Sequence, residues 1–343
     1  MSGVQTLTIA DGEADQRLDR WFRRHFPQIS QGRIEKMCRK GEIRVDGGRV
    51  KPASRVQAGQ SVRIPPLPEA TAPSRPMPVV PSDADAQMIQ SAVLYRDADL
   101  IALNKPPGLP SQGGSGQGAR HVDGLSEALR FGAEDKPRLV HRLDKDTSGV
   151  LLLARSRAAA AALTKAFRAR DTRKIYWAAV AGVPAPRMGT IRFGLAKAGG
   201  ERERMICVHP DAVEQTAGAK RATTDYAVIE PAGNRLSWAA LVPVTGRTHQ
   251  LRAHMAEIGH PILGDGKYGG SAQENLGDGW GAGTGGALSR KLHLHARSLV
   301  LRHPTTGAML HLTAPLPEHM RRTWDLLGWR ASDAPVDPFV PED

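Results

Sequence analysis

Hydrophobic positions near the N-terminus recur with a helical period. One apolar stripe has the spacing i, i+3, i+4, i+8 and consists of Leu18, Trp21, Phe22 and Phe26. This spacing predicts an amphipathic helix that ends before Pro27. A second helix is predicted to follow, with Ser30 as its N-cap. Its inner face is apolar, with Ile34, Met37 and Cys38. Its outer face is cationic, with Arg33, Lys36, Arg39 and Lys40.

The pattern then changes to the alternation of strands. Ile43 and Val45 alternate with charged residues, Asp46-Gly47-Gly48 suits a tight turn, Val50 begins a return, and "QSVRI" adds a last strand. Two helices and a small sheet predict a compact α/β module over residues 15–65. Arg17 to Arg63 holds 13 Lys or Arg against four Asp or Glu, so this segment carries +9 of the net charge of +12. We expect the helix face to contact nucleic-acid phosphates, the alternative being a solvated surface.

A change of composition separates this module from the rest of the chain. Residues 66–89 are rich in Pro, Ala and Ser, which predicts an extended linker. Residues 90–330 form a second unit in which buried strands such as "LIALNKP", "VLLLA" and "KIYWAAVAG" outnumber helices. Two helices are expected, over "SRAAAAALTKAFRAR" and over "THQLRAHMAEIG", where Thr248 is the expected cap. The absence of strict βα alternation favours an α+β fold with a mixed, mainly antiparallel sheet.

Several function classes are disfavoured by the sequence. No run approaches a membrane span, and no signal or transit pattern opens the chain, so we expect a cytoplasmic protein. We also expect a monomer, although no pattern in the sequence bears on the oligomeric state. Cys38 and Cys207 cannot form a disulfide framework or a cysteine zinc site. The histidines of "HQLRAH" are five apart and do not match H-E-x-x-H, and "GGSGQG" lacks the Lys-Ser/Thr ending of a phosphate loop. We therefore expect neither a metal nor a cofactor.

The most chemically suggestive stretch is "LVHRLDKDTSGVLLLARS", Leu139 to Ser156. It places a dense group of charges, Asp144 among them, directly before the buried run Val150 to Leu153. The polar residues and Gly149 between them suit a tight turn that would fix the Asp144 carboxylate. A fixed carboxylate stays ionised if a cation lies nearby, and "PVTGRTHQLRAH" offers Arg247 and Arg252. A purely structural Asp–Arg bridge is the alternative.

Four motifs in order resemble one family. "NKPPGL", "HRLDKDTSG", "RKIYWAAVAG" and "PVTGRTHQLRAHMAEIGHPILGDGKYG" resemble the motifs of RluA-type pseudouridine synthases, over roughly residues 93–316. The basic module resembles the S4-like RNA-binding domain. That combination is typical of the branch acting on large-subunit ribosomal RNA, and "QGGSG" resembles the RluC-like subgroup.

The resemblance implies specific roles. Asp144 would be the catalytic aspartate, attacking either the uracil ring or the ribose anomeric carbon, and Arg252 would keep it ionised. Tyr176 would stack on the target base, and Arg142 would enter the RNA stack where the base departs. The isomerisation conserves all atoms and implies no cofactor and no metal. His249 and His254 are expected to pack or to contact RNA. A non-catalytic RNA-binding factor and a transfer-RNA substrate are the alternatives.

Overall fold

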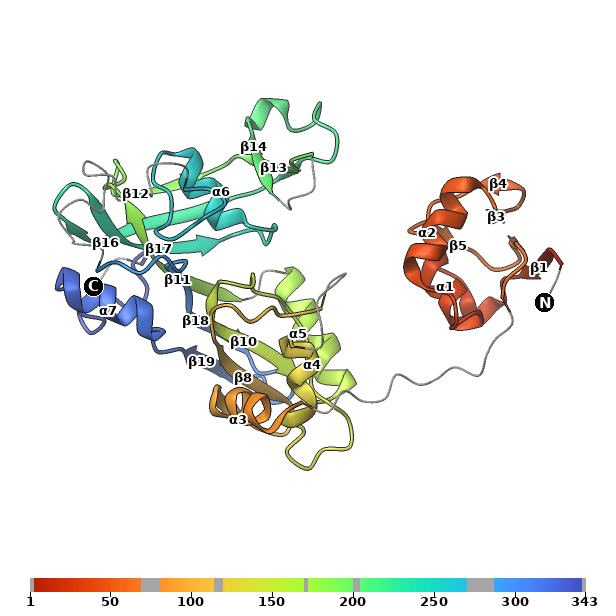
Figure 1. Ribbon diagram of the computed structural model, residues 1–343, viewed down its shortest axis with the longest axis horizontal. Coiled ribbons are helices and arrows are strands. Elements are labelled where there is room, and N and C mark those ends of the chain that lie inside the picture. Colours follow the sequence, from red (N-terminus) through yellow and green to blue (C-terminus); the bar gives the residue numbers. More distant parts are fainter. Residues whose placement is uncertain are drawn as a thin grey trace. The chain divides into compact units, whose positions relative to one another are not determined.

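The computed structural model describes residues 3–68, 81–113, 120–169, 172–199, 204–269 and 287–340 (Figure 1). The chain divides into two compact units, Met1–Val79 and Val80–Asp343. Each unit has its own hydrophobic core.

The N-terminal unit contains the two predicted helices, α1 (Leu18–His25) and α2 (Gln31–Lys40). They enclose a core whose most deeply buried side chains include Leu18, Trp21, Phe22, Ile34 and Met37. Ser30 caps α2, because its side chain accepts a hydrogen bond from the Arg33 amide at 3.4 Å. The antiparallel sheet has the order β1 (Gln5–Thr8), β6 (Ser61–Ile64), β3 (Arg44–Val45) and β4 (Gly48–Arg49), and β2 (Gln16–Arg17) pairs with β5 (Arg55–Val56). The return strand thus begins at Gly48 and not at Val50.

The predicted linker, residues 66–89, is partly helical. Residues 69–80 lie outside the described part of the chain, but α3 spans Asp83–Ser91. Ser82 caps this helix by accepting from the Asp85 amide at 3.2 Å, and Ile89 is fully buried in the core of the C-terminal unit. The expectation of an extended segment up to residue 89 was therefore wrong for α3, where the Ser82 cap and the packing of Met88 and Ile89 on the core of the C-terminal unit support a helix.

A ten-stranded sheet dominates the described part of the C-terminal unit. The strands run in the order β12 (Met188–Ile191), β16 (Thr224–Ala232), β17 (Leu236–Pro243), β11 (Arg173–Ala181), β18 (Leu294–Arg302), β10 (Ser148–Ala154), β8 (Leu100–Lys105) and β7 (Val93–Arg96). In addition, β19 (Met309–Thr313) pairs with β18, and β9 (Arg138–Leu139) pairs with β10. A smaller sheet holds β13 (Gly194–Lys197), β14 (Met205–Val208) and β15 (Lys220–Arg221). Within the main sheet, β10 and β18 pair in parallel, and the other described strand pairs are antiparallel, which confirms the predicted α+β class.

Helices cover both faces of this sheet (Figure 1). On one face of β11 and β17, Trp177 and Trp238 pack with Trp324 of α7 (Glu318–Leu327). On the other face, the intervening residues of the same strands pack with Met255 of α6 (Gln250–Glu257). Further along, α5 (Arg157–Ala169) covers one face of β10, while α3 and α4 (Val122–Leu125) cover the other. No described helix is long and apolar enough to cross a membrane.

The middle of the sheet aligns three residues across three adjacent strands. Tyr176 of β11 is opposite Ala296 of β18, and Ala296 is paired with Gly149 of β10. Gly149 has φ +107°, and a Cβ there would lie 2.2 Å from the Ala296 carbonyl oxygen, so only glycine fits. Arg297 is an extra residue in β18 opposite the step from Ile175 to Tyr176. Such a bulge re-aims the side chains beside it, and here it lies next to Tyr176.

Candidate active site

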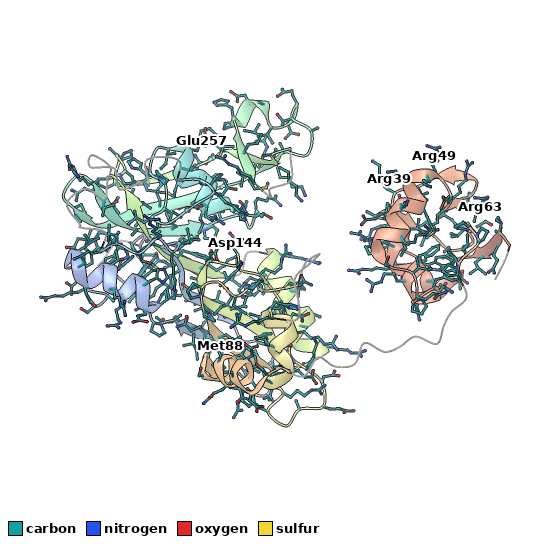
Figure 2. The ribbon with its side chains drawn as sticks, viewed as in Figure 1. Arg39, Arg49, Arg63, Met88, Asp144 and Glu257 are labelled. Atoms are coloured by element: carbon teal, nitrogen blue, oxygen red, sulfur yellow. The ribbon has the colours of Figure 1, made fainter. Side chains whose placement is uncertain are left out.

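Asp144 lies on the loop between β9 and β10, near the middle of the C-terminal unit (Figure 2). The residue before it is fixed from both sides: the Ser111 hydroxyl accepts from the Leu143 amide at 3.0 Å and donates to the Leu143 carbonyl at 2.7 Å. Beyond Asp144 the chain turns, with the Thr147 amide donating to the Asp144 carbonyl at 3.2 Å. The Asp144 side chain is 27% exposed. The loop therefore presents a carboxylate that is held in place yet accessible.

A buried lysine ties this loop to the "NKPPGL" segment. The Lys105 Nζ is fully buried and donates to three backbone carbonyls, those of Pro106 (2.9 Å), Leu109 (2.7 Å) and Lys145 (2.9 Å). Three acceptors match the three N–H groups of an ammonium. Burial lowers the pKa of Lys105 to about 7, against the attraction of the Asp146 and Asp144 charges. Lys105 thus holds the residue next to Asp144 through the Lys145 carbonyl.

The depressed pKa of Lys105 predicts a pH-dependent contribution to stability. Below pH 7 the lysine is protonated in both states, so its burial cost is fully present. Between pH 7 and about 10 the unfolded chain binds more protons than the folded one, so stability rises with pH, by up to about 1.4 kcal/mol per pH unit. We expect urea unfolding to show that, between pH 7.5 and pH 9.5, the unfolding free energy of the wild type rises relative to that of Lys105→Met. Lys145→Met, an exposed lysine on the same loop, is the control. A pH-independent difference from Lys105→Met would contradict the prediction.

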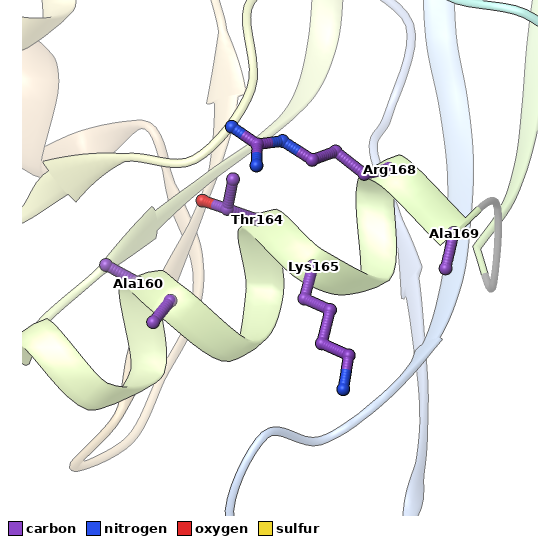
Figure 3. A pocket seen from close by; sticks show the side chains of 6 residues that line it. Ala160, Thr164, Lys165, Arg168 and Ala169 are labelled. Carbon is purple, nitrogen blue, oxygen red and sulfur yellow. The ribbon is translucent and has the colours of Figure 1, made fainter. Parts of the chain in front are cut away.

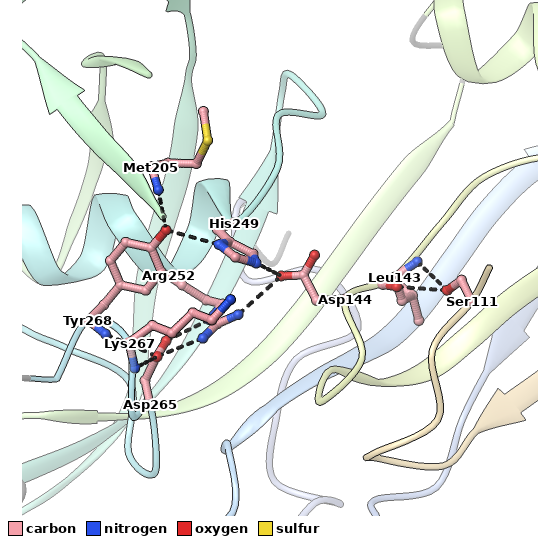
Figure 4. Close-up of polar contacts among 9 residues, drawn as sticks. All are labelled: Ser111, Leu143, Asp144, Met205, His249, Arg252, Asp265, Lys267 and Tyr268. Carbon is pink, nitrogen blue, oxygen red and sulfur yellow. Dashed lines mark hydrogen bonds and ion pairs between the residues drawn. The ribbon is translucent and has the colours of Figure 1, made fainter. Parts of the chain in front are cut away.

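Arg252 on α6 faces Asp144 while a second carboxylate anchors it (Figure 4). Its Nε and Nη2 donate to the two oxygens of Asp265, both at 2.7 Å, and its Nη1 lies 3.5 Å from Asp144 Oδ2. Burial alone would lower the pKa of Arg252, but the hydrogen bonds and charge of Asp265, together with the charge of Asp144, raise it. A permanent positive charge is therefore held before Asp144. Of the two arginines suggested by the sequence, the structure brings Arg252 to the carboxylate, whereas Arg247 is exposed and donates to the Arg221 carbonyl.

Asp265 was not predicted as a site residue, because an aspartate before a glycine has the signature of an ordinary turn. It does form that turn, since its Oδ1 accepts from the Lys267 amide at 2.9 Å and from the Tyr268 amide at 3.2 Å. Its side chain is 0% exposed. Only the three-dimensional structure shows that the same carboxylate also holds Arg252.

His249 is a further neighbour of Asp144. Thr248 was expected to cap α6, but the N-cap residue is His249, which has the left-handed conformation φ 51°, ψ 20° and makes no side-chain cap. Its Nε2 lies 3.9 Å from Asp144 Oδ2, and its Nδ1 lies 3.0 Å from the Tyr268 hydroxyl. The side chain is turned toward the carboxylate and not toward the helix amides, which is why the predicted cap was wrong.

Tyr176 packs between two hydrophobic clusters of the sheet, on the opposite face of β11 from Trp177. Burial, and to a smaller extent the negative charge of Asp144, raise the pKa of Tyr176. Its phenol is therefore neutral at physiological pH. Arg142, two residues before Asp144, has an exposed side chain. The structure thus gathers Tyr176 and Arg252 around Asp144, and leaves Arg142 on the outside of the same loop.

His141 has a structural position. Its Nε2 accepts from the Leu152 amide at 3.0 Å, and its ring stacks on Phe167 at 4.4 Å between centroids. Burial, with the nearby Lys174 charge, lowers the pKa of His141 to about 3, so the ring is neutral. His141 therefore fastens the start of the Asp144 loop to β10.

The predicted cationic face of α2 is present and exposed in the N-terminal unit. Its four predicted RNA-contacting side chains are all exposed: Arg33, Lys36, Arg39 and Lys40. Arg39, labelled in Figure 2, also borders a hollow of about 610 Å³ that is lined by Arg17, Glu35, Cys38, Val50, Lys51, Pro52 and Ala53 as well. Three cations and one acid line this hollow, and one of the cations, Arg17, is paired with the Asp19 carboxylate.

Two other features lie apart from the Asp144 site. A hollow of about 640 Å³ runs along α5 and is lined by Ala160, Ala161, Thr164, Lys165, Arg168 and Ala169 (Figure 3). Asp97, Asp99 and His303 place possible metal-ligating atoms within 4.8 Å of one another. The Asp97 carboxylate, however, already accepts from the Tyr95 hydroxyl, the His303 Nε2–H and the amides of Asp99 and Leu100. That set of bonds fits a structural role for Asp97 in the β7–β8 turn.

Comparison with known proteins agrees with the motifs. The RNA pseudouridylate synthase family matches residues 99–257, and the S4 domain matches residues 16–62. Ribosomal large subunit pseudouridine synthase C of Salmonella typhi is 36% identical over 335 residues, which cover 96% of this chain and 98% of that protein. The Escherichia coli K12 protein of the same name is 37% identical over 326 residues, covering 93% and 95%.

Solved structures extend the agreement to the fold. Human RNA pseudouridylate synthase domain containing 4 superimposes with a TM-score of 0.56 at 28% identity, over 71% of this chain and 95% of that one. Human RNA pseudouridylate synthase domain containing 1 gives a TM-score of 0.51 at 27% identity, over 67% and 86%. The chain therefore belongs to the RNA pseudouridylate synthase family and is an RNA pseudouridine synthase, an isomerase. Its N-terminus is an S4 domain.

Proposed function

We propose that this protein isomerises uridine to pseudouridine in large-subunit ribosomal RNA, with Asp144 as the nucleophile. The observation that carries this proposal is the Asp144 carboxylate itself: it is partly exposed, fixed by its loop, and 3.5 Å from a buried arginine. A nucleophilic carboxylate has to be ionised at neutral pH, and a neighbouring guanidinium favours the charged form. The names of the relatives support the RNA substrate.

The reaction balances without a further reactant. The bond between the ribose anomeric carbon and N1 of uracil breaks, and a bond from that carbon to C5 forms. The hydrogen on C5 leaves as a proton, and N1 gains one. Asp144 attacks either the anomeric carbon or the uracil ring, and it is released when the new bond is complete. No electrons are gained or lost, so a cofactor is unnecessary for the balance.

The remaining residues would help the uridine to leave the RNA stack and would contact it in the site. Both candidate target atoms are hidden in a stacked helix, so the uridine has to leave the stack. The planar guanidinium of Arg142, exposed beside Asp144, would fill the gap that the base leaves. The neutral phenol of Tyr176 would stack on the flipped base, and because it keeps its own proton it would not take the proton from C5. Arg252 would keep Asp144 ionised throughout.

The S4 domain would supply affinity for structured RNA. Its exposed cations on α2, namely Arg33, Lys36, Arg39 and Lys40, are suited to contact phosphates. Ribosomal RNA as the substrate also favours a protein that works in the cytoplasm, and we propose that it acts there as a monomer. Transfer RNA is the competing substrate, and side-by-side assays on the two RNAs distinguish them: we expect product in a large-subunit transcript and none in transfer RNA.

Neutralising the α2 cations is expected to weaken RNA binding in a salt-dependent way. With all four changed to glutamine, the slope of log K against log salt should become shallower by up to about 3.6, because each lost phosphate contact removes about 0.7 to 0.9. Filter binding across a salt series measures the slope. The control changes four exposed arginines of the C-terminal unit, Arg302, Arg321, Arg322 and Arg330, to glutamine. Equal slopes for the two variants would rule out α2 as the RNA anchor.

A further inference from the structure

Two groups converge on one oxygen of Asp144. Among the described residues, both ion-pair contacts of this carboxylate end on Oδ2, from Arg252 Nη1 at 3.5 Å and from His249 Nε2 at 3.9 Å (Figure 4). The guanidinium of Arg252 can only donate hydrogen bonds, whichever of its nitrogens faces Asp144. His249 can offer Asp144 either an N–H or a lone pair, depending on which ring nitrogen carries the hydrogen. The role of His249 therefore depends on its tautomer.

Tyr268 determines that tautomer. Its hydroxyl oxygen lies 2.9 Å from the Met205 amide nitrogen, which can only donate, so the tyrosine oxygen is the acceptor in that bond. The tyrosine's own hydrogen remains available to its other neighbour, His249 Nδ1, at 3.0 Å, which favours the arrangement in which Nδ1 accepts. A neutral imidazole that accepts at Nδ1 carries its hydrogen on Nε2. The Nε2–H consequently faces Asp144.

The same turn positions both partners of Asp144. Asp265 holds the Arg252 guanidinium with its side chain and the Tyr268 amide with Oδ1. The Tyr268 ring also lies 5.3 Å from the Arg252 guanidinium carbon. His249 is buried and kept in a left-handed conformation, which a histidine adopts only when its surroundings fix it.

We propose that His249 is a positioning residue for the reaction: Tyr268 fixes its Nε2–H tautomer, and this N–H and Arg252 together hold Asp144 by Oδ2, so that Oδ1 is the attacking oxygen. The proposal rests on the proposed function of Asp144 as the nucleophile. The 3.9 Å separation shortens to a hydrogen bond when RNA closes the site, as catalytic hydrogen bonds commonly do. This role differs from the RNA contact or packing expected of His249 from the sequence.

Nuclear magnetic resonance tests the tautomer in the free full-length protein. Long-range ¹H–¹⁵N correlation of ¹⁵N-histidine protein, with His249 assigned from a His249→Gln spectrum, should show Nδ1 unprotonated and Nε2 protonated. Tyr268→Phe should remove this preference. Tyr226→Phe, which deletes a hydroxyl bound to the Pro186 carbonyl, should leave the preference unchanged. A wild-type His249 protonated on Nδ1 would overturn the proposal, and this readout does not depend on what Asp144 does.

Kinetics test the donor to Asp144 with a matched pair of variants. The amide of glutamine reaches the position of Nε2, while that of asparagine reaches only the position of Nδ1. We expect His249→Asn and Tyr268→Phe to lower kcat for pseudouridine formation by about 10-fold or more with KM within twofold, and His249→Gln to retain most of the wild-type kcat. Equal kcat for His249→Asn and wild type, or a raised KM with unchanged kcat, would overturn the proposal. An active Asp144→Asn enzyme would instead refute the proposed function, so the two failures are distinguishable.

Discussion

An Asp144→Asn enzyme is expected to form pseudouridine at least about 10⁴-fold more slowly than wild type, the order of loss seen when a nucleophile is removed. The asparagine amide has nearly the same shape but carries no charge, so it cannot attack carbon or form an ion pair with Arg252. The loop should keep its structure, because its fixing bonds run through the backbone of Leu143 and Asp144. Nucleoside analysis of digested RNA measures the product. RNA affinity should stay within about twofold.

Asp146→Asn is the matched control for this change. Asp146 lies two residues further on the same loop, has an exposed side chain, and loses the same charge on substitution. Its activity should remain within a few-fold of wild type. A loss in Asp146→Asn as large as that in Asp144→Asn would mean that the loop's total charge, and not one carboxylate, is what the reaction requires.

Replacing Arg252 by methionine is expected to have the largest effect on folding. The Asp265 side chain is 0% exposed and would lose the guanidinium that both of its oxygens bind. Removing one partner of a buried ion pair leaves an uncompensated charge and costs about 3 to 5 kcal/mol of unfolding free energy. Urea unfolding measures this loss. Activity should fall as well, since Asp144 loses its nearest positive charge.

A double variant separates the loss of stability from the loss of activity. Arg252→Met combined with Asp265→Asn removes both buried charges, while the asparagine oxygen can still accept from the Lys267 and Tyr268 amides, so part of the lost stability should return. Activity should not return, because Asp144 still lacks its cation. Full stability of the single Arg252→Met variant, or recovery of activity in the double variant, would contradict the assigned arrangement.

Local patterns predicted much of the fold. The stripe from Leu18 to Phe26 and the cap at Ser30 defined α1 and α2, because helix period and capping are set by neighbouring residues. The prediction failed at α3 and at the start of α6. At α6 the N-cap residue is His249, whose side chain contacts Tyr268, 19 residues away, and no local pattern contains that contact.

At the candidate site, too, the sequence predicted some residues and missed others. Motifs pointed to Asp144 and Arg252, since a charged turn before a buried strand and an arginine-bearing helix are visible in the sequence. Three contacts that hold this pair in place were not predicted. They are the hydrogen bonds of Ser111 with Leu143, of Lys105 with the Lys145 carbonyl, and of Asp265 with Arg252. Each is a contact between segments far apart or inside a turn. Their residue types are ordinary, and only the fold gives them their partners.

The central claim is that the Asp144 carboxylate carries out the reaction on uridine. The most direct test is single-turnover tritium release from large-subunit RNA labelled at C5 of uridine, with enzyme in excess and saturating. Wild type and Asp146→Asn should release tritium at comparable rates, whereas Asp144→Asn should release none above background while binding the RNA normally. Release from Asp144→Asn at the wild-type rate would contradict the account.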